Sequence, residues 1–161
     1  MKLKEFFEYF KSEKYDLRGK YSAVDVAKYI ANKCSVERHF ISNLQLQKIM
    51  YYVQKHFLQT QKRALFSEEI EAWAFGPVVR KVYDYFCGFG AMPIFFLLSS
   101  ESPIAKEDSK VIDRIVESKR ELNPWAMVED THQKGKAWDM IYQDGLGYKD
   151  VIPKRLIAKN G

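Results

Sequence analysis

Apolar residues along most of this chain recur every three or four positions, the spacing of a helix with one buried face. The pattern is longest over residues 43–61, where five apolar side chains share one face of a helix. They are Leu46, Ile49, Met50, Val53 and Phe57. Ser42 or Asn43 stands at the position of an N-cap. The pattern therefore predicts a long central helix with these apolar side chains in the core.

The same spacing predicts helices on both sides of this segment. Before it, we expect a helix over residues 2–14 and a second that begins at a Ser22 cap and ends near Cys34. The expected later helices cover residues 77–86, 109–122, 125–131, 137–143 and 153–158. Since helices account for most of the periodic segments, the sequence predicts an all-α (mostly α) fold, with residues 1–161 in one compact domain.

Two segments do not follow the helical pattern. Residues 65–75 have poor helical periodicity and predict an extended or short hairpin-like connection. Residues 92–98 are apolar on all sides and predict a buried strand or buried irregular chain.

The stretch IEAWAFGPVVRKVYDYF, residues 70–86, joins aromatic residues to a Gly-Pro pair. Pro77 suits the first position of a helix, because its φ is already helical and its missing N–H has no partner there. Gly88 would then take the left-handed C-terminal cap, and Cys87 would be a small buried residue.

Composition limits the class of protein. The chain has 161 residues, 47% of them hydrophobic, which is enough for a core without metal or disulfides. Its two cysteines lack a C-x-x-C spacing, and no signal-peptide pattern precedes them. We expect reduced thiols and a cytoplasmic location. The longest apolar run has seven residues, too few to span a membrane.

Charge is distributed unevenly along the chain. The net charge is +5, made up of +7 over residues 1–63, −4 over residues 64–108 and +2 over residues 109–161. A basic half beside an acidic middle indicates either internal pairing or attraction of charged partners.

No catalytic or metal-binding pattern stands out. Cys34 and Cys87, with three histidines, supply the residue types of a Cys-dependent hydrolase but no local motif for one. No pair of these residues has the spacing of zinc ligands, and no phosphate-binding glycine loop is present. We therefore predict no catalytic residue, no metal and no cofactor, and the hydrolase stays an alternative.

A phage-related or regulatory DNA-binding protein is the second alternative. The N-terminal half is basic, and residues 24–49 have the outline of a helix-turn-helix. The connection over residues 35–41 is longer than the turn of that motif, however. The second helix also carries only Lys48 and Lys55 as cations. Direct contact with nucleic acid is the less favoured prediction.

Three blocks carry a resemblance to a known family. They are residues 43–58 (NLQLQKIMYYVQKHFL), 68–86 (EEIEAWAFGPVVRKVYDYF) and 131–138 (THQKGKAW). Together they resemble the Panacea domain family, a phage-associated domain typified by SocA-like antitoxins, and the resemblance covers about residues 24–161. One departure is Lys136-Ala137 before Trp138, where the family often has Pro-Trp.

The resemblance implies a helical, non-enzymatic module that neutralises a cognate toxin by direct contact. The toxin would be encoded by an adjacent gene, and some members are described as adaptors that hand the toxin to a protease complex. The predicted partner-binding residues are Phe75, Arg80, Tyr83 and Lys48. The residues predicted to serve the fold are Trp73, Gly76, Pro77, His132 and Trp138. Of the fold residues, we expect Trp73 to fill the core and His132 to pack on Trp138. For Lys48, the alternative to partner binding is an ion pair with Glu71 or Asp84.

Overall fold

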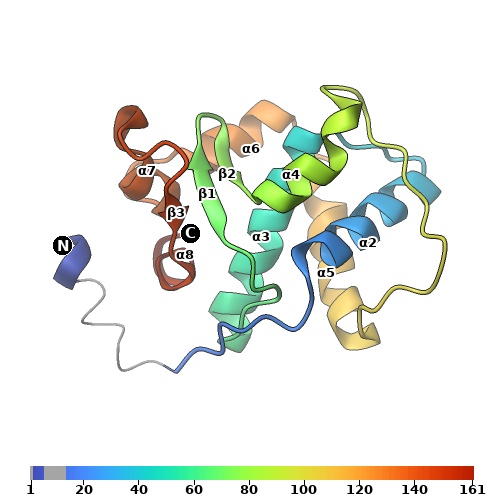
Figure 1. Ribbon diagram of the computed structural model, residues 1–161, viewed down its shortest axis with the longest axis horizontal. Coiled ribbons are helices and arrows are strands. Elements are labelled where there is room, and N and C mark those ends of the chain that lie inside the picture. The colour runs from blue at the N-terminus through green and yellow to red at the C-terminus, as the bar shows by residue number, and fades with distance from the viewer. Residues whose placement is uncertain (1, 6–13) are drawn as a thin grey trace.

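The structure is a computed structural model that describes residues 2–5 and 14–161. One long helix, α3 (Asn43–Gln61), passes through the centre, and most other elements pack around it (Figure 1). The predicted helix over residues 2–14 falls largely on residues 6–13, which lie outside the described residues. The mostly α fold is confirmed.

The remaining elements follow in chain order. Before α3 comes α2 (Ala23–Val36). After it come β1 (Ile70–Trp73), β2 (Gly76–Val78), α4 (Arg80–Phe86), η1 (Cys87–Phe89), α5 (Lys106–Lys119), α6 (Pro124–Thr131), α7 (Ala137–Tyr142), η2 (Gln143–Gly145), β3 (Val151–Ile152) and α8 (Lys154–Asn160). Figure 1 shows α2 and α5 on one side of α3, and α7, α8 and β3 on the other.

The central helix forms as its apolar spacing predicts. Leu46, Met50, Val53 and Phe57 are all fully buried. Ser42 caps the helix, and its side chain and that of Gln45 each bond to the other's backbone N–H in a capping box. The cap satisfies N–H groups that the first turn cannot pair, so the helix begins where the sequence predicts. At α2, Ser22 likewise accepts a hydrogen bond from the Asp25 N–H.

The expected hairpin-like connection is an antiparallel hairpin of β1 and β2, and β3 pairs with the other edge of β1. The prediction that Pro77 begins a helix is wrong, because Pro77 lies in β2 opposite Ala72, and α4 begins only at Arg80. Since β2 is an edge strand, a proline there removes no hydrogen bond that the sheet needs. Gly76 is the first residue of β2 and has a φ of +111°, a conformation that glycine adopts without the steric cost of a Cβ.

The chain after α4 also differs from expectation. Gly90, not Gly88, adopts positive φ and ends η1. Cys87 is exposed rather than buried. Residues 92–98 form no regular element, and Ile94 alone among them is buried. This connection runs past α2 at the outside of the molecule (Figure 1), and its Met92, Phe95 and Leu97 side chains are exposed.

Candidate functional site

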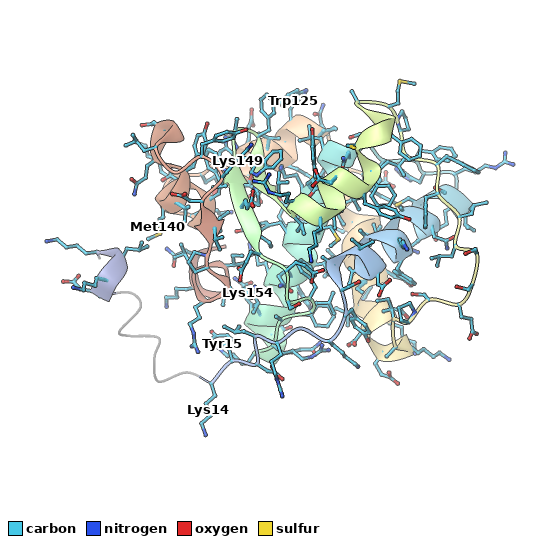
Figure 2. All side chains as sticks on the ribbon, viewed as in Figure 1. Lys14, Tyr15, Trp125, Met140, Lys149 and Lys154 are labelled. Atoms are coloured by element: carbon cyan, nitrogen blue, oxygen red, sulfur yellow. The ribbon has the colours of Figure 1, made fainter. Side chains whose placement is uncertain are left out.

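A cavity of 590 Å³ opens where the start of α3, the β1–β2 hairpin and the start of α6 meet. Within the described part of the chain, five aromatic side chains line it and form what we call the aromatic groove: Trp73, Phe75, Tyr83, Trp125 and Tyr148. They come from the hairpin, α4, α6 and the connection before β3. Figure 2 shows Trp125 and Lys149 in the same part of the molecule, near the turn of the hairpin.

Two members of the groove are open to solvent to an unusual degree for their size. Phe75 is 57% exposed and Trp125 is 56% exposed. Their rings contact each other edge to face, with centroids 5.5 Å apart. Phe75 is placed there by the hairpin, because Trp73 pairs with Gly76 and only Ala74 and Phe75 remain to form the turn. A large apolar side chain at a turn tip packs little against its own core, so it is available to a partner.

Trp73 forms the wall of the groove. Its ring lies 5.0 Å from that of Tyr83 and 6.5 Å from that of Tyr148. The structure leaves Trp73 partly exposed, so it lines the cavity and does not fill the core as expected.

Glu71 orients both the indole of Trp73 and the guanidinium of Arg80. Its carboxylate accepts a hydrogen bond from Trp73 Nε1 at 2.8 Å and two from Arg80, at 3.0 and 2.9 Å. Burial opposes ionisation of Glu71, yet the bonds from Arg80 and Trp73 hold its pKa below the ordinary value. Arg80 and Lys149 both lie against the Trp73 ring, 5.6 and 5.3 Å from its centroid.

Lys48 lies beneath the groove, not on the surface. It is fully buried, and its Nζ donates a hydrogen bond to the Pro77 carbonyl at 3.0 Å. No carboxylate within residues 2–5 and 14–161 pairs with it, so the expected partners Glu71 and Asp84 are not used. Burial lowers the pKa of Lys48 to about 7, because a charged ammonium is disfavoured away from water.

Gly76 allows Lys48 to occupy this position. A Cβ atom at Gly76 would lie 2.9 Å from Lys48 Cε and 2.9 Å from Thr131 Oγ1. The hairpin, α3 and α6 can therefore approach closely only with glycine at this point. The three sequence blocks that carry the family resemblance meet here.

Two α3 side chains tie the groove together. Gln47 had no role in the sequence-based predictions, and Asn43 was considered there only as an N-cap. Gln47 accepts the Val79 N–H at 2.9 Å and donates to Asn43, whose amide in turn donates to the Tyr83 carbonyl at 3.1 Å. Both are buried. Their polar identity inside a buried stretch of helix was the signal that could have identified them.

The predicted neighbours His132 and Trp138 support the hairpin from behind. Their rings stack in parallel with centroids 3.6 Å apart, which confirms the expected packing. Trp138 Nε1 donates to the Trp73 carbonyl at 2.8 Å and so fixes the end of β1. Burial, and then the charge of Lys48, lower the pKa of His132.

The predicted partner-binding residues thus separate into two groups. Phe75, Tyr83 and Arg80 are exposed and lie at the groove, whereas Lys48 lies under it. Trp125 and Tyr148 belong to the groove but were not predicted. Neither has a local signal, because each joins the groove only through contacts with segments distant in sequence.

The thiols do not form an activated pair. Burial raises the pKa of Cys34, which disfavours the thiolate that a nucleophile requires. Cys87 is exposed on η1, elsewhere on the chain. Among the described residues, no group of three or more His, Cys, Asp or Glu side chains could hold a metal ion. No helix within residues 2–5 and 14–161 has the length and apolar character needed to cross a membrane.

The arrangement also bears on DNA recognition. The second helix of the supposed helix-turn-helix is α3, and 12 of its 19 residues are buried among the other elements. A recognition helix must offer a face to the major groove, and most of α3 has none to offer.

Comparison with known proteins gives one family. The model of the family described as "Antitoxin SocA-like, Panacea domain" matches residues 46–139, which include Trp73, Phe75, Tyr83 and Trp125. A protein named Antitoxin SocA from Caulobacter vibrioides (strain NA1000 / CB15N) is 32% identical over 127 residues, which cover 72% of this chain and 68% of that protein. No solved structure matches the chain.

Proposed function

Since this chain belongs to the SocA-like antitoxin family with a Panacea domain, we propose that it binds a cognate toxin protein directly and thereby neutralises it. The contact surface in this proposal is the aromatic groove, with Phe75 and Trp125 as its anchors. The toxin is the product of an adjacent gene, and both proteins act in the cytoplasm. No catalytic residue and no cofactor take part.

The observation that supports the proposal most is the exposure of aromatic rings around one cavity. Protein interfaces draw most of their affinity from a few aromatic or arginine side chains that become fully buried on binding. Phe75, Trp125 and Tyr83 are large and partly exposed. Phe75 and Trp125 pack on each other and Tyr83 packs on Trp73, so a partner could bury these rings with little loss of side-chain freedom. Arg80 is already held in place by Glu71.

Co-expression tests the proposal. The adjacent gene product is induced in cells that carry this protein, the Phe75→Ala variant or the Phe95→Ala variant. Phe95 is the matched control, because it is another exposed phenylalanine (61%) and packs on Phe40, not on the groove. We expect the wild type and Phe95→Ala to restore growth and to co-purify with the toxin, and Phe75→Ala to do neither at an unchanged melting temperature. Growth inhibition that the wild type does not relieve would contradict the proposal.

Neutralisation can proceed by occlusion of the toxin or by its delivery to a protease complex. The second mode is the one described for some members of the family that this chain resembles. The toxin's half-life in the presence of the wild type distinguishes them. A stable toxin in a stoichiometric complex supports occlusion, and a short-lived toxin supports delivery. Both modes require the same direct contact, so Phe75→Ala should abolish either effect.

A further inference from the structure

The charges around the aromatic groove are not balanced. Among the described residues that line the cavity, Lys48 is the one basic side chain and none is acidic. The first turn of α3, which reaches the cavity with Ser42, Asn43 and Leu44, carries no acidic residue either. The N-terminal end of a helix has positive potential, whichever protonation state Lys48 adopts. The cavity therefore disfavours cations and favours a negatively charged group.

Among the described residues, Lys149 is a cation at the mouth of the groove that has no ion-pair partner, although its charge interacts with that of Glu71. Arg80 is bound by Glu71 through two hydrogen bonds, and Asp84 further offsets its charge. Lys149 is exposed and makes no ion pair within the described residues. Its Nζ lies against two rings of the groove, 5.3 Å from the Trp73 centroid and 5.2 Å from the Tyr148 centroid.

The backbone holds Lys149 in this position independently of its side chain. Its N–H donates to the Ala72 carbonyl at 2.7 Å, which attaches the connection before β3 to the middle of β1. The base of the side chain is therefore fixed by the backbone, while its ammonium has no ion-pair partner among the described residues. Such a lysine adds little to the fold and can turn from the rings to an incoming carboxylate.

We infer that the aromatic groove receives a segment of the toxin in which an apolar side chain stands beside an Asp or Glu residue. The apolar side chain packs between Phe75, Trp125 and Trp73, and the neighbouring carboxylate pairs with Lys149 at the rim. This inference rests on the proposed function and names the chemistry of its partner. The carboxylate belongs to a side chain within the segment, because the cations stand on the open rim, where a chain can pass across, and Lys48 at the floor is already bonded to Pro77.

Charge reversal at the rim tests the inference. The affinity of purified toxin is measured for the wild type, Lys149→Glu and the matched control Lys110→Glu, which makes the same change in net charge on exposed α5. We expect Lys149→Glu to raise Kd at least tenfold at low salt, with a smaller difference at high salt, and Lys110→Glu to change it less than twofold. A scan that converts each Asp and Glu of the toxin to Lys should then find one variant that restores binding to Lys149→Glu.

Several outcomes would overturn the inference. If the wild type binds the toxin and relieves its toxicity but Lys149→Glu binds equally well, this inference fails and the proposed function stands. If the wild type neither binds nor relieves toxicity, both fail. Loss of binding when the toxin's C-terminus is extended by Gly-Ser, with no effect of the acidic scan, would assign the carboxylate to the chain end.

Two further measurements separate other occupants of the groove. A wild-type dimer in light scattering that Phe75→Ala converts to a monomer would assign the groove to a second copy of this chain. Binding of a mixed-sequence single-stranded oligonucleotide that Lys149→Glu abolishes, without toxin binding, would assign it to nucleic acid. Either result contradicts the inference.

Discussion

The buried Lys48 makes stability depend on pH in a defined direction. Its pKa is about 7 in the folded protein, against an ordinary value of 10.5. Between these values the unfolded chain binds more protons than the folded one, so raising the pH through this window stabilises the fold. From pH 7 to pH 9 the expected gain is about 2 kcal/mol, since each full unit of pKa difference corresponds to about 1.4 kcal/mol.

Replacing Lys48 by Met isolates this contribution. In the wild type at pH 7, folding must deprotonate or bury the Lys48 ammonium, which lowers the free energy of unfolding by about 5 kcal/mol for the full pKa difference. The Met variant is free of this cost. It loses the bond to the buried Pro77 carbonyl, at a cost of about 1–3 kcal/mol. We therefore expect Lys48→Met to be more stable than the wild type by about 2–4 kcal/mol at pH 7.

Urea denaturation of both proteins at pH 7 and pH 9 measures the effect. Burial also lowers the pKa of Lys55, but Lys55 is present in both proteins, so its contribution cancels in the difference between them. Among the described residues, His132 is the group whose pKa responds to the charge of Lys48, and that pKa is already lowered below its ordinary value, so His132 is neutral at pH 7 and pH 9 and the difference reports Lys48. We expect the advantage of Lys48→Met to shrink by about 2 kcal/mol at pH 9. An advantage that is the same at both pH values, or a variant less stable than the wild type at pH 7, would refute the reasoning.

Three further predictions concern single positions. Gly76→Ala should lower the free energy of unfolding by about 1–3 kcal/mol, because φ is positive there and the new Cβ would crowd Lys48. Gly88→Ala is the control and should change it little, since a Cβ there meets nothing within 4 Å. Equal effects of the two substitutions would contradict this prediction. Phe57→Ala should cost about 3–5 kcal/mol in urea denaturation because the side chain is fully buried, and a loss below 1 kcal/mol would show that the site collapses around the cavity. Cys87→Ser should retain full relief of toxicity, and loss of that relief with an unchanged circular dichroism spectrum would revive the hydrolase alternative.

The central helix could be predicted from sequence because every signal for it is local. Its apolar spacing, its Ser42 cap and its capping box all lie within one continuous segment. The hairpin was harder, since the same Gly-Pro pair serves a helix start or an edge strand. What decides between them is the pairing of β1 with β2 and β3, and that pairing involves residues up to 152.

The position of Lys48 could not be predicted for a related reason. Lysines are rarely buried without a charged partner, so a surface position was the reasonable expectation. Burial follows from the hairpin and α6 closing over α3, which depends on Gly76 and Thr131, both far from Lys48 in sequence. Trp125 and Tyr148 show the same limitation, because the groove exists only after the α6 and β3 regions meet the hairpin.

The site therefore divides into a buried scaffold and an exposed surface with different physical constraints. Each scaffold residue makes a close contact across elements that helps to hold the hairpin in place: Lys48, Gly76, Gln47 and Trp138. Phe75 contacts mainly another exposed ring, Trp125. Exchanging such surface side chains changes what the groove can bind at little cost to the fold. A scaffold of this kind can therefore present groove surfaces of different chemistry on the same hairpin.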